Sequence, residues 1–196
     1  MSISADLVKT LREKTGVGFM ECKTALAEAK GDLEAAVTIL RKKGLSASAK
    51  KAGRETKEGL IGCYVHNGKI GVMVELNCES DFVARNSDFQ ALIHDIAMHI
   101  AASDPRFIRK EDVTEDVIAK EREIYREQAR ATGKPDNVLD KIVEGRMAKF
   151  YAETCLLEQP FVKEPSISVK DHIASHIQKI GENMQVRRFV RYRLGE

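Results

Sequence analysis

A single short segment, residues 77–86, carries side chains that could make a specific contact with a partner molecule. Its central positions hold a hydroxyl, a carboxylate, two apolar groups and a guanidinium: Ser80, Asp81, Phe82, Val83 and Arg85. A lone phenylalanine in a turn commonly folds back into the core. A phenylalanine that projects can instead be an apolar anchor, with charged neighbours that fix its register on a partner. The residues alone leave both interpretations open.

Two regular elements are predicted to hold this segment in place. Before it, apolar side chains alternate with polar or small ones, as in β-strands: Ile61, Cys63, Val65, then Ile70, Val72, Val74 and Leu76. The intervening pair Asn67-Gly68 favours a type I′ turn, which needs positive φ twice. After the segment, Ser87 or Asp88 is placed to cap a helix. One face of that helix is apolar: Phe89, Leu92, Ile93, Ile96 and Ile100.

The first 45 residues are predicted to form a compact three-helix bundle, which resembles the ubiquitin-associated type. Apolar side chains recur there at helical spacing in three groups: Leu7, Val8 and Leu11; Met20, Leu26 and Ala29; Leu33, Ala36, Val37 and Leu40. Positive φ is available at Gly16 and Gly18. Asp32 is placed to cap the third helix and Gly44 to end it. Residues 46–59 are mostly small or charged and predict a linker, which leaves residues 60–196 as the core domain.

The rest of the core is predicted to contain a helical hairpin, a further helix and a last strand. Residues 114–131 and 136–157 form the hairpin, with a turn at Gly133-Lys134-Pro135 and Asp136 as a cap. Residues 169–180 form the further helix. In the strand, one face is expected to hold Met184, Val186, Val190, Tyr192 and Leu194, and the other Gln185, Arg187, Arg191 and Arg193. This strand completes a three-stranded antiparallel sheet with helices on one face, an α+β fold.

Composition limits the possible functions. The chain has 196 residues, 43% hydrophobic and 32% charged, with a formal net charge of +2. That balance argues against a dedicated nucleic-acid-binding domain, although arginines in the last strand and lysines in the linker keep this alternative open. The chain shows no signal peptide and no apolar run near the roughly 18 residues that span a bilayer. A cytoplasmic location is expected, with reduced thiols at Cys22, Cys63, Cys78 and Cys155.

No motif points to catalysis. The sequence lacks a phosphate-binding loop, a dinucleotide fingerprint and a nucleophile elbow. The pair His172 and His176 has helical metal-ligand spacing, but the interpretation as two half-exposed surface histidines is preferred. We therefore expect no enzyme activity, no cofactor and no bound metal. A small enzyme with an unrecognised site remains the second alternative to a binding protein.

Several motifs, in order along the chain, resemble the elongation factor Ts family. They are LREKTGVGFMECKTAL at residues 11–26, KKA at 50–52, ESDFVARN at 79–86, LEQPFV at 157–162, and GEN at 181–183 followed by RRF at 187–189. The resemblance covers the whole chain. One departure is Ser80, where the family usually has threonine, and the hydroxyl is retained.

The resemblance implies a guanine-nucleotide exchange factor for elongation factor Tu. In this family the N-terminal bundle docks on the nucleotide-binding domain, and the segment Ser80, Asp81, Phe82 and Val83 displaces Mg²⁺ so that GDP leaves and GTP binds. The length accommodates one core subdomain, which corresponds to the short form of the family. That form is expected to pair through its core domain as a homodimer, which gives a two-plus-two complex with elongation factor Tu. Neither a membrane nor direct nucleic-acid binding is expected.

Overall fold

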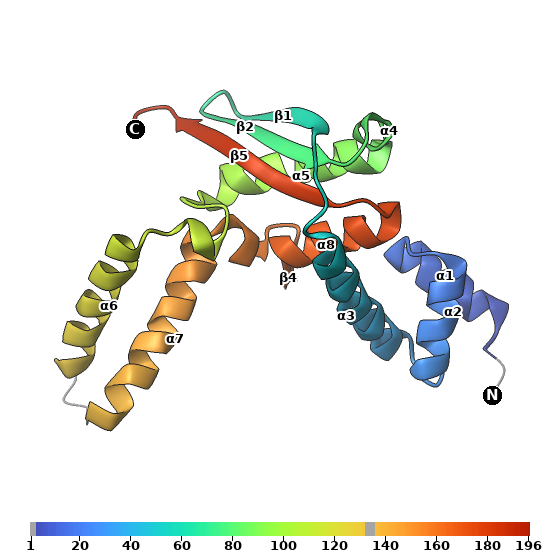
Figure 1. Ribbon diagram of the computed structural model, residues 1–196, viewed down its shortest axis with the longest axis horizontal. Coiled ribbons are helices and arrows are strands. Elements are labelled where there is room, and N and C mark those ends of the chain that lie inside the picture. The colour runs from blue at the N-terminus through green and yellow to red at the C-terminus, as the bar shows by residue number, and fades with distance from the viewer. Residues whose placement is uncertain (1–2, 132–135) are drawn as a thin grey trace. The chain divides into compact units, whose positions relative to one another are not determined.

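The computed structural model describes residues 3–131 and 136–196, without the side chains of residues 136 and 137. Figure 1 traces the helices and strands along the chain. Their order is α1 (Ala5–Thr15), α2 (Phe19–Glu28), α3 (Leu33–Lys51), β1 (Glu58–His66), β2 (Ile70–Cys78), α4 (Asp81–Ala84), α5 (Ser87–Ser103), η1 (Lys110–Asp112), α6 (Glu115–Arg130), α7 (Asp136–Thr154), η2 (Leu156–Glu158), β3 (Pro160–Phe161), β4 (Glu164–Ser168), α8 (Val169–Ile180) and β5 (Met184–Arg193).

The chain divides into two compact units. The first unit contains Met1–Gly62, Val74–Asp95 and Asp171–Phe189. The second contains Cys63–Met73, Ile96–Lys170 and Val190–Glu196. The boundaries fall within β1, β2, α5 and β5, so the units do not follow the predicted domain borders at residues 45 and 59. Those borders stay a prediction.

The predicted sheet and its hairpin are confirmed. The strands form an antiparallel sheet in the order β1-β2-β5, and β3 and β4 form a separate two-stranded ribbon. At the hairpin turn, φ is 51° at Asn67 and 67° at Gly68, as a type I′ turn requires. The amide of Lys69 donates to the carbonyl oxygen of His66 at 2.9 Å and closes the turn.

The two strands of the hairpin differ in whether their alternating apolar residues are buried. In β2 the buried set is the predicted apolar one, Val72, Val74 and Leu76. In β1 the apolar residues Ile61 and Val65 are exposed instead. The reason is visible at Gly62 in the first unit, where an added Cβ would lie only 2.7 Å from Ile93 Cγ1. The inward face of β1 has to be small there because α5 approaches so closely.

The prediction for β5 is wrong in its second half. Met184 and Val186 are buried, but Val190, Tyr192 and Leu194 are exposed. Arg191, expected outside, has a side chain only 9% exposed, with Nη1 at 3.2 Å from Asp104 Oδ1. Its Nε also donates to the carbonyl oxygen of Ala101 at 3.4 Å. These partners offset the cost of burying a guanidinium, whereas simple alternation assigns every inward position to an apolar residue.

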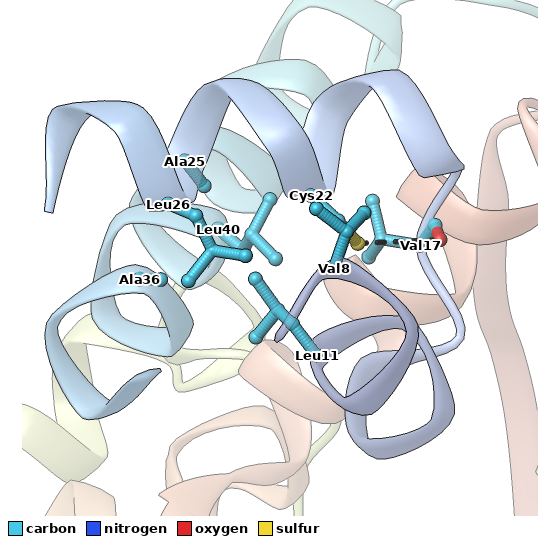
Figure 2. Packing of buried hydrophobic residues seen from close by; sticks show 8 residues of the cluster. All are labelled: Val8, Leu11, Val17, Cys22, Ala25, Leu26, Ala36 and Leu40. Atoms are coloured by element: carbon cyan, nitrogen blue, oxygen red, sulfur yellow. Dashed lines mark hydrogen bonds between the residues drawn. The ribbon is translucent and has the colours of Figure 1, made fainter. Parts of the chain in front are cut away.

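Helices α1, α2 and α3 share one apolar cluster, as predicted. Figure 2 shows its buried side chains, which are Val8, Leu11, Val17, Cys22, Ala25, Leu26, Ala36 and Leu40. Asp32 Oδ1 accepts from the amide of Ala35 at 3.0 Å, which confirms the predicted cap. Gly16 has φ of 67°, but Gly18 has φ of −57° and does not use the left-handed region. Met20, expected inside, is 68% exposed.

Gly44 does not end the third helix, contrary to the prediction. Helix α3 continues to Lys51, through the first residues of the predicted linker. An added Cβ at Gly44 would lie 2.6 Å from Gln178 Oε1 and 3.8 Å from the carbonyl oxygen of Ala174, both on α8. The glycine therefore permits close approach of α3 to α8 inside the first unit, where Figure 1 shows the two helices adjacent. A helical glycine costs about 1 kcal/mol relative to alanine, which this contact offsets.

The predicted helical hairpin in the second unit is formed by α6 and α7 (Figure 1). Its buried residues include Val143, Met147 and Phe150. Two ion pairs cross between the helices, Arg122–Glu144 at 2.5 Å and Arg126–Asp140 at 2.9 Å. The predicted turn at residues 133–135 and the side-chain cap by Asp136 lie outside the described part of the chain.

Candidate partner-binding tip

The predicted contact segment forms a short turn of helix between β2 and α5, within the first unit. We call residues 79–86 the tip. Ser80 is the N-cap of α4, and its Oγ accepts from the amide of Val83 at 3.5 Å. Ala84 is buried at the other end of this single turn. The turn thus has a fixed side, which faces the protein, and an outward side.

Phe82 lies on the outward side. Its side chain is 78% exposed, so it does not fold back into the core. Asp81 and Val83, on either side of it, are partly exposed. A large aromatic ring held in water by a short, capped turn is unfavourable for the isolated chain. That geometry is suited to an apolar anchor that another molecule buries.

Charged and polar neighbours orient the tip. Arg85 Nη2 lies 2.7 Å from Asp81 Oδ2, and both side chains remain accessible to water. Such exposed pairs contribute little to stability, so the pair mainly restricts the directions of the two charges. Asn86, rather than the predicted Ser87 or Asp88, caps α5, because its Oδ1 accepts from the amide of Asp88 at 2.8 Å.

Two groups behind the tip hold its backbone. Glu182, distant in sequence, accepts hydrogen bonds from the amides of Glu79 and Ser80 at 3.1 and 3.0 Å. Cys78 Sγ lies 3.1 Å from the carbonyl oxygen of Ser80. Burial, assisted by the charge of Glu182, raises the pKa of the Cys78 thiol to about 11. The thiol therefore stays protonated at neutral pH and donates to that oxygen, a structural role rather than a nucleophilic one. Glu182 was not among the predicted site residues, although it lies in the GEN motif at residues 181–183.

A second exposed apolar group was also missed. At the start of α2, Phe19 is 45% and Met20 is 68% exposed. A signal for Met20 was present in the sequence. Residues two apart on a helix differ by about 200°, so Met20 lies opposite the buried Cys22. The side of α2 that bears Met20 is thus available to a partner.

The alternative sites receive less support. His172 and His176 are half-buried, with ring centroids 4.8 Å apart, and burial lowers the pKa of His176. His172 Nε2 lies 3.9 Å from Asp95 Oδ2. Within residues 3–131 and 136–196, no group of three or more His, Cys, Asp or Glu is arranged to hold a metal ion. The described helices likewise include none long and apolar enough to cross a membrane.

The arginines of β5 are largely engaged in ion pairs. Arg188 Nε lies 2.7 Å from Glu75 Oε2, and this hydrogen bond lowers the pKa of Glu75. Arg193 pairs with Glu196 at 3.4 Å, and Arg191 is held as described above. A nucleic-acid-binding strand would direct such side chains toward phosphates. The side chains of Arg188 and Arg193 are 78% and 57% exposed, so their ion pairs are weak and the RNA-binding alternative stays open.

Comparison with known proteins identifies the family. A family model described as Elongation factor TS matches residues 33–196. Elongation factor Ts of Solibacter usitatus is 63% identical over 195 residues, covering 99% of this chain and 92% of that protein. The corresponding protein of Koribacter versatilis is 62% identical, covering 100% and 90%. That of Fervidobacterium nodosum is 61% identical, covering both chains completely. On these matches, the chain belongs to the elongation factor Ts family.

Proposed function

We propose that the chain is a guanine-nucleotide exchange factor that binds elongation factor Tu–GDP and promotes GDP release, so that GTP can bind. Membership of a translation elongation factor family supports this role, which would be carried out in the cytoplasm without a cofactor or catalysis by the chain itself. The observation that carries the proposal is Phe82, 78% exposed on an anchored turn. It is an apolar group placed for burial in a partner.

The proposed mechanism uses the tip as a wedge. Phe82 enters between side chains of elongation factor Tu near its Mg²⁺ and phosphate site, while Asp81 makes a polar contact beside it. The displaced residues of elongation factor Tu no longer hold Mg²⁺. Without the ion, the phosphates of GDP lose their main counter-charge and the nucleotide dissociates. Ser80 and Val83 keep the turn in shape through the cap between them.

The free energy of burying Phe82 is too small to account for the acceleration of GDP release by itself, so docking must contribute. Burying one phenylalanine contributes about 1.5–3 kcal/mol. An acceleration of GDP release by about 10⁴-fold needs roughly 5.5 kcal/mol off the barrier. We propose that the N-terminal helices supply part of the difference by docking on the nucleotide-binding domain, with the exposed Phe19 and Met20 in that contact. Coupling is reciprocal, so GDP must weaken binding of this chain as much as the chain weakens binding of GDP.

We further propose that two chains form a homodimer. In the second unit, an outer sheet face exposes Val65, Met73, Val190, Tyr192 and Leu194. Val65, Met73, Val190 and Tyr192 come from β1, β2 and β5, which are neighbours in the sheet, and Leu194 directly follows β5. An exposed apolar patch on adjacent strands is typical of an interaction surface. A second copy that packs the same face against it would bury both and produce a two-plus-two complex with elongation factor Tu.

Release of fluorescent GDP from purified elongation factor Tu tests the function. Catalytic amounts of the chain should accelerate release, and Phe82→Ala should reduce the acceleration strongly while leaving detectable binding. Val162→Ala, which trims another exposed apolar side chain, is the matched control. Full activity of Phe82→Ala would refute the wedge. No acceleration by the folded wild type would refute the exchange function and direct attention to salt-dependent RNA binding.

A further inference from the structure

The carboxylate of Glu182 joins the end of α8 to the backbone of the tip. Helix α8 ends at Ile180, and Gly181 turns the chain with φ of 94°. Glu182 Oε2 then accepts from the amides of Glu79 and Ser80, at 3.1 and 3.0 Å. Its Oε1 accepts from the hydroxyl of Ser80 at 2.6 Å. One side chain therefore satisfies two backbone donors and one side-chain donor, 102 positions away from Ser80.

These bonds continue into the helical turn that bears the exposed ring. Ser80 Oγ donates to Glu182 and accepts from the amide of Val83, so the carboxylate and the cap share one hydroxyl. Helix α4 has only four residues. A helix of that length has no stability of its own in water. The direction of Phe82 therefore depends on contacts from outside the turn, and Glu182 provides three of them.

The loop that carries Glu182 is itself held by the tip. Glu79 Oε1 accepts from the amide of Asn183 at 2.6 Å and lies 3.4 Å from Arg54 Nη1. Asn183 is buried, and its Nδ2 donates to the carbonyl oxygen of Arg54 at 2.9 Å. Each of the two glutamates thus accepts backbone amides from the loop of the other. Charge-assisted bonds of this kind are among the stronger hydrogen bonds in proteins.

We propose that Glu182 is a positioning residue for nucleotide exchange. It holds the tip in the conformation that presents Phe82 before the partner arrives, which lowers the ordering cost at the moment of insertion. Glu182 is not required to contact elongation factor Tu itself. This inference rests on the exchange function proposed above. It predicts that loss of Glu182 slows GDP release at saturation but leaves docking on the partner unchanged.

The test measures GDP release over a range of chain concentrations for wild type, Glu182→Ala and Glu182→Gln. With Glu182→Ala the saturating release rate should fall about ten- to hundredfold, because a poorly positioned group loses rates of that order. The half-saturating concentration should stay near the wild-type value, since the docking surfaces are intact. Glu182→Gln should recover part of the rate, because its amide oxygen still accepts from the two backbone amides. Glu164→Ala, an exposed glutamate in β4, is the control.

Backbone hydrogen exchange provides a readout of the anchor that is independent of activity. In Glu182→Ala the amides of Glu79 and Ser80 should exchange faster, while the amide of Leu26 in the N-terminal cluster keeps its protection. An unchanged saturating rate with unchanged protection at Glu79 and Ser80 would overturn the inference. Loss of protection throughout the chain would also overturn it, because Glu182 would then stabilise the whole fold. If wild type itself fails to accelerate release, the exchange function falls, and amide exchange still decides whether Glu182 anchors the tip.

Discussion

The tip and the outer sheet face expose apolar side chains in two different ways. The tip presents a single ring, Phe82, on a helical turn whose backbone is anchored from behind by Glu182. The outer sheet face presents several apolar side chains on strands whose backbones are already paired with one another. A single anchored ring is suited to insertion into a pocket, where one group acts at one point. A row of side chains on a rigid sheet is suited to a broad contact whose strength comes from area.

The largest predicted effect tests the sheet face. Tyr192→Glu places a carboxylate within the proposed dimer contact. An uncompensated buried charge costs about 3–5 kcal/mol, so dimer affinity should fall by about 10²- to 10³-fold or more. Sedimentation across a concentration series measures this change. A wild-type chain that is monomeric at all concentrations, or a variant that dimerises normally, would show that this face is not the contact.

The next effect tests the tip. Phe82→Ala should reduce the GDP release rate by about ten- to a hundredfold, which corresponds to the 1.5–3 kcal/mol of burying one phenylalanine. The midpoint of thermal unfolding should not fall, because the ring is exposed in the free chain. Fluorescent GDP release and thermal unfolding of the same samples check both statements. A clear loss of stability would mean that Phe82 packs against its own chain, contrary to the comparison.

A smaller effect concerns the hydroxyl shared by the cap and Glu182. Ser80→Ala removes the donor to Glu182 Oε1 and the acceptor for the amide of Val83. Loss of an N-cap costs about 1 kcal/mol, so the release rate should fall about fivefold. Ser80→Thr keeps the hydroxyl and should behave like wild type. Combined with Glu182→Ala, the effect of Ser80→Ala should be less than additive, because the two side chains share one bond.

The smallest effect concerns the charged pair on the tip. Arg85→Gln removes the partner of Asp81, an exposed pair of a kind that contributes about 0.3–0.5 kcal/mol. The stability of the free chain should change within that amount, measured by urea unfolding. A release rate lowered by more than about twofold would then reflect a contact of Arg85 with the partner rather than the lost pair. That result would show that the tip contacts the partner through Arg85 as well as Phe82.

Features with local causes could be predicted from the sequence. The turn at Asn67-Gly68 follows from the positive φ that both residues tolerate, and the cap at Asp32 from a carboxylate next to free amides. The alternation in β2 and the helical spacing in α1 and α3 mark their buried faces for the same reason. The exposed turn that carries Phe82 was also placed correctly between hairpin and helix.

Features that depend on what packs against an element were missed. Gly44 looked like a helix end but is the point where α8 approaches α3. Arg191 looked like a solvent-facing residue but is held by Asp104 and Ala101. Met20 was predicted to be buried because it was grouped with Leu26 and Ala29 in one apolar set. It lies instead on the side of α2 opposite the buried Cys22. In each case the pattern along the chain is compatible with two environments.

The sequence by itself determined the main helices and strands, their order and the family, since periodicity, caps, turn residues and motifs are all properties of nearby positions. It did not predict the short ribbon of β3 and β4. The tertiary structure alone decided that Phe82 is exposed and that Glu182 lies behind it. The physical reason is that backbone amides in a turn need acceptors, and the acceptor comes from any part of the chain that the fold brings near. The spacing of residues along the sequence does not show that Glu182 lies near the tip, because this depends on how α8 and β5 are packed.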